Sequence, residues 1–366
     1  MCKEIFNFIP VYRQLFKKMT NLFPKRFFVL GIYGKLQKNP GEETLEYAIG
    51  CDVGGTFVKM GVVLADGAVT ARDMVPLPPL TSPGYLASWL AGALTAFQEK
   101  NAPDGTPPKG VGIGIPGPVR FPDGTLFDPP NLPFSGEIPL GKLLRGLLPV
   151  PVTIDNDATV QTIGEAWVGQ GKGVKNFIYL ALGTGIGGGI VTDGAITRGA
   201  LGMAGEIGHL TIDWHGRPCR CGSRGCLETY ASINGIANSL REMGPSLPAD
   251  IRESLENGAW SGLPGLLKER LDQGETRWQK VWDIFADALG AGMGSLINLF
   301  NPEKIIISGG LSYHSPLFLS RAVETSRRYC FRRPAASCDI VTSRLKDNAG
   351  IIGAARMAFL STGNTP

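Results

Sequence analysis

The stretch YAIGCDVGGTFVKMGVVLADGAVTARDMVPL, residues 47–77, decides the fold class of this 366-residue chain. Apolar, β-rich runs lie on either side of Asp66-Gly67, a dipeptide suited to a tight turn, so the pattern predicts a β-hairpin. Residues 82–101 carry apolar residues at helical spacing, and GVGIGIPGPV, residues 110–119, predicts a buried strand that ends in a Gly/Pro turn. A hairpin, a helix and a buried strand in this order indicate an α/β lobe.

The rest of the chain continues the α/β pattern. Residues 150–157 and 175–191 predict strands on either side of a helical segment. A long helix is expected to stop before Pro302, to be followed by a buried strand, and residues 348–360 predict a helix rich in small residues. Because 366 residues exceed a typical single domain, we expect two domains.

The composition is that of a soluble globular protein, with 43% hydrophobic and 19% charged residues. The net charge of +4 is modest and arises largely from residues 1–38, which contain eight Lys or Arg and one acid. The remaining chain is nearly neutral, so no nucleic-acid partner is expected. Seven scattered cysteines do not resemble the even framework of a small secreted fold, so we expect a cytoplasmic protein.

Residues 1–45 form a basic, aromatic leader that we expect to lie outside the core. It is either an extension or the product of a start codon upstream of the true one, with Met19 as the later candidate. An amphipathic segment for a membrane surface or a partner is the alternative. Its longest apolar run, Phe27 to Tyr33, is far shorter than the roughly 20 residues that span a bilayer, so no membrane span is expected.

Glycine-rich turns between predicted strands are candidate phosphate sites. In DVGGT, residues 52–56, glycines allow the backbone to approach a phosphate, Thr56 adds a hydroxyl donor, and Asp52 can hold Mg²⁺ through its water shell. An ordinary glycine hairpin explains DVGGT alone equally well. A second cluster, GTGIGGG at 183–189, and the pair Gly309-Gly310 complete an ordered set suited to a triphosphate and its nucleoside.

Asp155-Asn156-Asp157 lies where a predicted strand meets a predicted helix, at the edge of an α/β sheet that usually holds ligands. Asp157 could act as a general base that takes a proton from a hydroxyl attacking phosphorus, and Asn156 could bind that substrate. Capping the helix N-terminus is the alternative role, and we expect one of the two acids to be the cap.

The segment GEIGHLTIDWHGRPCRCGSRGCLE, residues 205–228, concentrates cysteine and histidine. One imidazole and three thiolates are the ligand set of a closed, tetrahedral structural zinc site, and here the candidates are His209, Cys219, Cys221 and Cys226. Buried free thiols or a Cys219–Cys226 disulfide are the alternatives. His215 is a rival ligand, although Trp214-His215-Gly216 has the character of a loop apex.

A zinc ion in this loop would hold Glu206 and Glu228 close together. Two carboxylates beside a fixed imidazole make a hydrogen-bonding nest for a polyhydroxylated ligand such as a sugar. Without zinc, acids in surface salt bridges would be the better interpretation of both glutamates.

The order of DVGGT, GIGIPGPV, PNLP, DND, LGTGIGGGI, GEIGH, CRCGSRGCLE, NPEKIIISGG and DNAGIIGAA resembles the ROK family of bacterial sugar kinases and repressors. The resemblance spans about residues 47–360. It implies an α/β, two-lobed actin-like ATPase (ribonuclease H-like) fold with a structural zinc loop. Residues 46–162 plus 348–366 would form a small lobe, and residues 163–347 a large lobe that carries the zinc loop.

The resemblance also implies roles for single residues. Asp157 would deprotonate the sugar 6-hydroxyl. The other sugar contacts would be Asn131, Asn156, Glu206, His209 and Glu228, with His209 also on zinc. The nucleotide contacts would be Asp52, Gly54, Gly55, Thr56, Thr184, Gly185, Gly309 and Gly310. The family usually has Glu where this chain has Asp155, a shortening that leaves the Asn-Asp pair intact.

The function implied is an ATP-dependent sugar 6-kinase with Mg²⁺, foremost a glucokinase of glycolysis that acts as a homodimer or homotetramer. An N-acetylmannosamine or N-acetylglucosamine kinase is the alternative, and polyphosphate is a less favoured donor because no basic track accompanies the phosphate loops. A sugar-sensing repressor is less favoured still. Such repressors carry an N-terminal DNA-binding module of roughly 70 residues, whereas 45 precede the core here.

Overall fold

The computed structural model describes residues 46–129 and 132–363. The described residues belong to one compact unit. The hypotheses about the leader, and the sugar contact expected of Asn131, lie outside the described residues.

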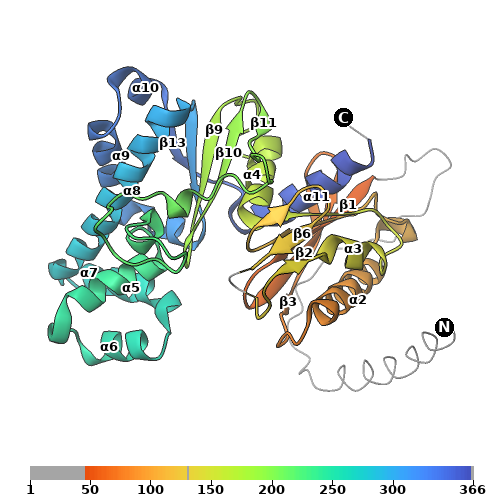
Figure 1. Ribbon diagram of the computed structural model, residues 1–366, viewed down its shortest axis with the longest axis horizontal. Coiled ribbons are helices and arrows are strands. Elements are labelled where there is room, and N and C mark those ends of the chain that lie inside the picture. Colours follow the sequence, from red (N-terminus) through yellow and green to blue (C-terminus); the bar gives the residue numbers. More distant parts are fainter. Residues whose placement is uncertain (1–45, 130–131, 364–366) are drawn as a thin grey trace. The chain divides into compact units, whose positions relative to one another are not determined.

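The first of two five-stranded sheets is built from the N-terminal part of the described chain (Figure 1). Its order is β3-β2-β1-β4-β8, with β1, β2 and β3 antiparallel and β4 and β8 parallel to β1. The strands are β1 Tyr47–Val53, β2 Phe57–Leu64, β3 Val69–Pro76, β4 Val111–Ile115 and β8 Val152–Asn156. The predicted hairpin is confirmed, and Gly67 takes the positive φ of +89° that its turn requires.

Helices cover both faces of this first sheet, because its strands alternate apolar side chains between two cores. The helices are α2 Pro83–Asn101 and α3 Leu140–Arg145 on one face and α11 Ala349–Ser361 on the other. Glycines let α11 lie directly on the strands: a Cβ at Gly50 would be 1.8 Å from the carbonyl oxygen of Ile351. The predicted helices at 82–101 and 348–360 are confirmed.

The second sheet has the order β11-β10-β9-β12-β13. Its strands are β9 Phe177–Leu182, β10 Ile186–Thr192, β11 Ala195–Ile196, β12 Lys304–Ser308 and β13 Asp339–Thr342. It packs on a helical core formed by α5 Ile233–Glu242, α6 Ala249–Glu256, α7 Leu263–Asp272, α8 Gln279–Phe300 and α9 Leu319–Arg328, with α10 Arg332–Ser337 beyond α9. As predicted, α8 stops before Pro302, and Asn301 ends it in the left-handed region.

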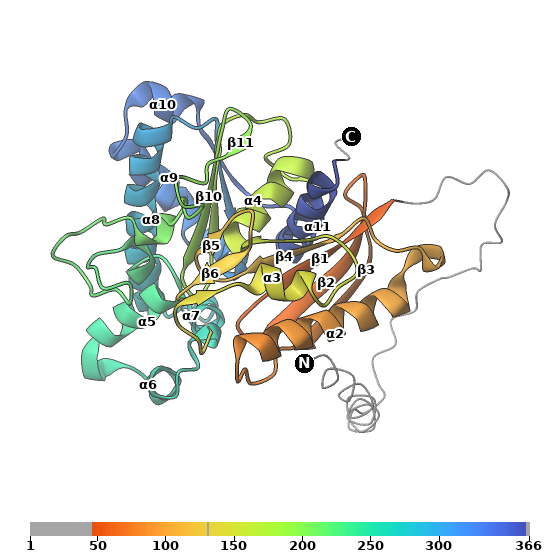
Figure 2. The ribbon, with the colours of Figure 1, turned by 45° about the vertical axis from the view of Figure 1, so that its right-hand side comes forward.

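Helix α4, Asp157–Val168, connects the two sheets. Figures 1 and 2 both show it alongside α11, and a Cβ at Gly353 would be 1.7 Å from the carbonyl oxygen of Val160. On its other side, a Cβ at Gly189 of β10 would be 1.9 Å from Thr162 Oγ1. The close packing fixes the start of α4, and therefore Asp157, relative to strands of both sheets.

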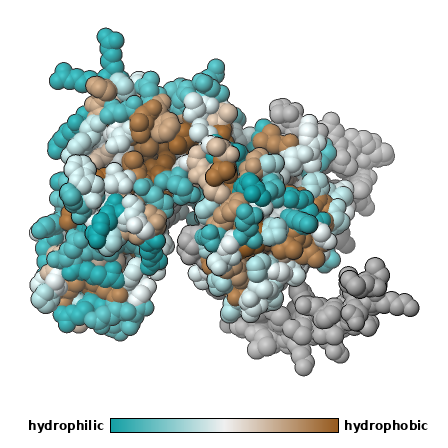
Figure 3. Space-filling model, in the orientation of Figure 1, coloured by the Kyte–Doolittle hydropathy of each residue, from teal (hydrophilic) through white to brown (hydrophobic). Residues whose placement is uncertain are grey.

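A small third sheet, β5 Val119–Arg120, β6 Thr125–Phe127 and β7 Glu137–Ile138, lies between β4 and α3 in the chain. Hydrophilic and hydrophobic side chains are mixed over the face of the molecule seen in Figure 3. Among the described residues, no helix combines the length and hydrophobicity that crossing a membrane requires.

Candidate functional site

The Asp155-Asn156-Asp157 segment forms the junction between β8 and α4. Asn156 caps α4, since its side-chain oxygen accepts a hydrogen bond from the Thr159 N–H at 3.1 Å. Its amide nitrogen donates to the Gly117 carbonyl at 3.1 Å. The expectation that one of the acids is the cap was wrong. An amide both accepts and donates, so Asn156 can tie the helix to the neighbouring loop, which a carboxylate cannot.

Asp155 has a different partner. Its carboxylate is fully buried and forms an ion pair with Arg198, which follows β11 of the second sheet. The guanidinium also lies 3.9 Å from the centroid of the Phe121 ring. Burial raises the pKa of Asp155, and Arg198 acts against that rise. The ion pair therefore joins the two sheets immediately beside Asp157.

Replacing Arg198 with methionine is expected to lower the free energy of unfolding by about 3 kcal/mol, because it leaves the Asp155 charge buried without its partner. Urea unfolding followed by circular dichroism measures the loss. The double variant Asp155→Asn/Arg198→Met removes both charges and is expected to recover at least half of it. An Arg198→Met protein as stable as the wild type would show that the ion pair contributes no net stability.

Asp157 is the carboxylate left to face a ligand. Its side chain is half-buried, and its Oδ1 accepts a hydrogen bond from the Ala158 N–H at 2.9 Å. Burial raises the pKa of Asp157, although this hydrogen bond acts in the opposite direction. A carboxylate with a raised pKa binds a proton more readily than an exposed one, which is the property a general base needs.

A cavity of about 170 Å³ includes Gln161 of α4, the helix that Asp157 begins, in its lining. It brings together Asp52 at the end of β1, Gly309 and Gly310 after β12, and Gly350 at the start of α11. Burial raises the pKa of Asp52 to about 6, the charge of Asp157 adds to the rise, and Lys59 lowers it. The two carboxylates therefore lie within electrostatic reach of each other, and a divalent cation would relieve their repulsion.

Of the other nucleotide contacts expected from the sequence, Gly54, Gly55 and Thr56 form the β1–β2 turn, and Thr184 and Gly185 form the β9–β10 turn. Neither turn lines the cavity itself. A Cβ at Gly185 would lie 2.5 Å from Glu228 Oε2, so the β9–β10 turn approaches the second glutamate of the zinc segment instead.

Sequence reasoning missed several residues that line the cavity: Gln161, Ser308, Ser312, Tyr313, Lys346 and Asp347. Lys59 was missed as well: it lies opposite Asp52 in the β1–β2 register, and its Nζ is 3.4 Å from Asp347 Oδ1. The β1–β2 register was a usable signal for Lys59, since the short DVGGT turn sets which residues of the two strands lie opposite each other.

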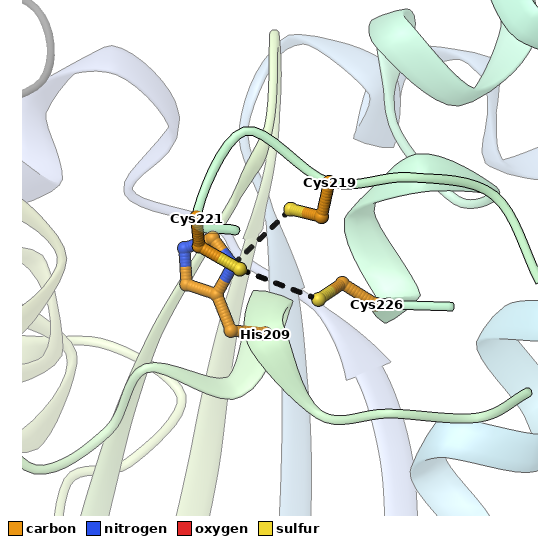
Figure 4. A group of neighbouring side chains, drawn as sticks. All are labelled: His209, Cys219, Cys221 and Cys226. Atoms are coloured by element: carbon orange, nitrogen blue, oxygen red, sulfur yellow. Dashed lines mark hydrogen bonds between the residues drawn. The ribbon is translucent and has the colours of Figure 1, made fainter. Parts of the chain in front are cut away.

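The four candidate metal ligands are brought together, as Figure 4 shows. Their ligand atoms all lie within 4.8 Å of one another. Cys221 Sγ is 3.7 Å from Cys226 Sγ, and Cys219 Sγ is 3.7 Å from His209 Nδ1. Thiolates at 2.3 Å from a tetrahedral zinc would be about 3.8 Å apart. The cluster is compatible with a zinc site.

Backbone contacts hold the cysteine loop in this form. The Cys219 N–H donates to the Ser223 carbonyl at 2.9 Å, and Gly225, with a φ of +63°, lies where a Cβ would be 1.6 Å from the Asp213 carbonyl oxygen. All three cysteines are free of disulfides in the structure. The rival ligand His215 is exposed and outside the cluster.

The two glutamates of the segment lie near the cluster, and Glu206 is also within electrostatic reach of Asp157. Glu228 Oε1 accepts a hydrogen bond from Cys219 Sγ at 3.3 Å and is 3.7 Å from His209 Nδ1. Burial raises the pKa of Glu206, as do the charges of Asp157 and Glu228, whereas His209 lowers it. The carboxylates of Glu206 and Glu228 thus lie near the imidazole, an arrangement suited to binding several hydroxyl groups.

The ROK family profile matches residues 48–359. The chain belongs to the ROK family. A glucokinase of Halalkalibacterium halodurans is 34% identical over 307 residues, covering 83% of this chain and 92% of the relative. A ROK family glucokinase from Streptomyces griseus, solved in complex with glucose and AMPPNP, is 31% identical with a TM-score of 0.72 and covers 86% of this chain and 99% of that chain.

The family also includes repressors. The xylose repressor of Caldicellulosiruptor bescii is 33% identical over 256 residues, which cover 68% of this chain and 62% of the repressor. The glucokinase similarity extends over most of both chains, and it supports a ROK family sugar kinase with the actin-like ATPase fold.

Proposed function

We propose that this protein is an ATP-dependent sugar 6-kinase, and specifically a glucokinase that converts glucose and ATP to glucose 6-phosphate and ADP. The position of Asp157 carries the proposal. Its charge raises the pKa of Asp52 in the cavity and also the pKa of Glu206 beside the imidazole. A base within reach of both a polyphosphate site and a hydroxyl-binding site is what phosphoryl transfer to a sugar requires.

On the donor side, the cavity suits the nucleotide. Gly309 and Gly310 allow close approach of the adenosine, and the turns at Gly54-Gly55-Thr56 and Thr184-Gly185 would present backbone N–H groups to the phosphates. Asp52 would hold Mg²⁺ through its water shell, and the ion would neutralise charge on the phosphates. The AMPPNP bound by the Streptomyces griseus glucokinase supports ATP as the donor.

On the acceptor side, Asn156, Glu206 and Glu228 would bind the sugar hydroxyls. Asp157 takes the proton of the 6-hydroxyl as that oxygen bonds to the γ-phosphorus and the bond from phosphorus to the ADP oxygen breaks. His209 Nδ1 faces the thiols at 3.7 Å, which leaves Nε2 of the same ring for the sugar.

The metal cluster would position the sugar site without taking part in the chemistry. Four protein ligands close a tetrahedral zinc site, so the ion would supply cross-linking of the loop and no open position for a reacting group. Glu228 lies two residues after Cys226, so fixing the cluster would also fix the backbone that carries this carboxylate.

Activity should depend on pH through Asp157. The base must be ionised, so kcat/KM is full above its pKa in the free protein and is lost as the pH falls through that value. Burial raises the pKa of Asp157, so the acid limb of a kcat/KM profile is expected above the ordinary aspartate value of about 3.9. Circular dichroism at each pH separates the limb from unfolding. Constant kcat/KM down to pH 4 in folded protein would argue against Asp157 as the base.

The proposal is tested by coupled ADP release with Mg·ATP across glucose, mannose, fructose, N-acetylglucosamine and N-acetylmannosamine, on protein purified without chelator. We expect glucose to give the highest kcat/KM by at least about tenfold, a difference of about 1.4 kcal/mol in transition-state binding.

The other outcomes would correct the proposal in defined ways. A preference for an N-acetyl sugar would identify an N-acetylhexosamine kinase built on the same site. No turnover of any sugar by folded, zinc-loaded protein would contradict the kinase and favour the sugar-sensing class to which the xylose repressors belong.

A further inference from the structure

A second cavity, of about 560 Å³, lies away from the residues assigned to phosphoryl transfer. Its lining comes from α4 and α11, from the end of β10 and β11, and from single residues near β5 and β8. Figures 1 and 2 show α4 and α11 side by side, and the cavity includes Trp167 of the first helix and Met357 and Leu360 of the second. Its volume is in the range of small-molecule sites.

The charged groups that line this cavity are all cationic. Arg198 and Arg356 are its ionisable side chains, and no carboxylate is among the described residues that line it. The Arg356 guanidinium lies 5.0 Å from the centroid of the Trp167 ring, and burial lowers its pKa. The remaining walls are aromatic and aliphatic, with Phe121 and Ile163 among them.

Two polar atoms of the lining lack partners. Within the described part of the chain, Arg356 Nη1 and Thr153 Oγ1 are buried without a hydrogen bond. Buried polar groups are nearly always hydrogen-bonded, and those that are not commonly meet a ligand, ion or water. Both residues line the cavity, and an unpaired guanidinium nitrogen and an unpaired hydroxyl at its wall favour a ligand that carries negative charge.

We infer that this cavity binds a small amphipathic anion, a carboxylate or phosphate attached to an apolar body. The anionic group pairs with Arg356 and Arg198, and the apolar body packs against the aromatic and aliphatic walls. Residues 1–38, with eight Lys or Arg and one acid, have the wrong charge to occupy the cavity.

The site has a consequence for the reaction, and that consequence rests on the proposed function. Arg198 pairs with Asp155, and Asp155 Oδ1 accepts a hydrogen bond from the Asn156 N–H at 2.8 Å, next to Asp157. An anion bound to the Arg198 guanidinium would weaken the ion pair between Arg198 and Asp155. We therefore expect occupancy to change kcat.

Binding is tested without any assay of activity, on the full chain, with 8-anilinonaphthalene-1-sulfonate as an anionic probe and N-phenyl-1-naphthylamine as its neutral counterpart. The variant Arg356→Met keeps the packing on Trp167 and removes the charge. The variant should raise the Kd for the anionic probe by about tenfold or more, and it should change the Kd for the neutral probe by less than about twofold. Displacement by 1-naphthoate and by 1-naphthyl phosphate then distinguishes a carboxylate from a phosphate ligand.

Two further variants make the test specific. Ala166→Trp fills the cavity from α4 and should weaken the binding of both probes. Arg332→Met replaces an exposed arginine of α10 and should leave the binding of both probes unchanged. Equal affinity for the anionic probe in wild type, Arg356→Met and Ala166→Trp would contradict the proposal that this cavity binds an anion. Binding that depends on Arg356 but leaves kcat unchanged at saturation would overturn the regulatory consequence alone.

Discussion

Replacing Asp157 with asparagine is expected to lower kcat for glucose phosphorylation by about 10³-fold while glucose binding stays measurable. Asparagine retains the shape of the side chain and can still accept the hydrogen bond from the Ala158 N–H, but it cannot take a proton. Steady-state kinetics gives kcat, and isothermal titration calorimetry with glucose gives the affinity.

The matched control is Asp73→Asn, which removes an exposed carboxylate of β3 that pairs with Lys100 on the surface. This variant should keep wild-type kcat, because the pair lies on the surface and neither residue lines the cavity assigned to the nucleotide. A retained kcat in Asp157→Asn, with the control unchanged, would remove Asp157 from the role of base.

Replacing Cys221 with serine is expected to reduce bound zinc from one ion per chain to below about a tenth, and to raise the KM for glucose by about tenfold or more. A neutral hydroxyl is a far poorer zinc ligand than a thiolate, and the loop that holds Glu228 beside His209 loses its cross-link. Metal content is measured by mass spectrometry on protein purified without chelator.

Cys338→Ser is the control, since Cys338 is a half-buried cysteine outside the cluster. It should retain zinc and the wild-type KM. Stoichiometric zinc in Cys221→Ser would mean that the ligand set is wrong. Loss of zinc with an unchanged KM would separate the metal from the sugar site.

Some glycines were visible in the sequence as turn residues, and at certain of these positions only glycine fits the backbone. Gly67 needs a positive φ, and a Cβ at Gly309 would be 2.3 Å from the Leu182 carbonyl oxygen. Such a requirement applies to a single residue, so it appears in the sequence as a glycine at that position. The cysteine segment is similar, since its four ligand residues lie within 18 residues of one another along the chain.

Long-range partners left no comparable signal. Arg198 pairs with Asp155, which is 43 residues away along the chain, and Lys59 pairs with Asp347, which is 288 residues away. Each of these charges alone is indistinguishable from a solvated surface residue, because the pairing exists only once two sheets are in place. The choice of Asn156 as the helix cap likewise depended on the Gly117 carbonyl, which only the folded loop brings within reach.

Several helices between β10 and α8 were also missed. The segment from Ile233 to Asp272 contains α5, α6 and α7, but Pro248 and Pro264 and several glycines interrupt any long periodic pattern. Strand β13 has four residues, too few to establish a period of two. Packing on the core around α8, rather than local sequence preference, stabilises these elements.

The central claim is that the protein transfers the γ-phosphoryl group of ATP to a sugar 6-hydroxyl, with Asp157 as the base that takes the hydroxyl proton. It is tested most directly by incubating the zinc-loaded protein with [γ-³²P]ATP, Mg²⁺ and either glucose or 6-deoxyglucose, then separating labelled sugar phosphate from labelled inorganic phosphate. We predict labelled glucose 6-phosphate as the main product and no labelled sugar from 6-deoxyglucose. Label in inorganic phosphate alone, from folded protein that binds glucose, would contradict the account.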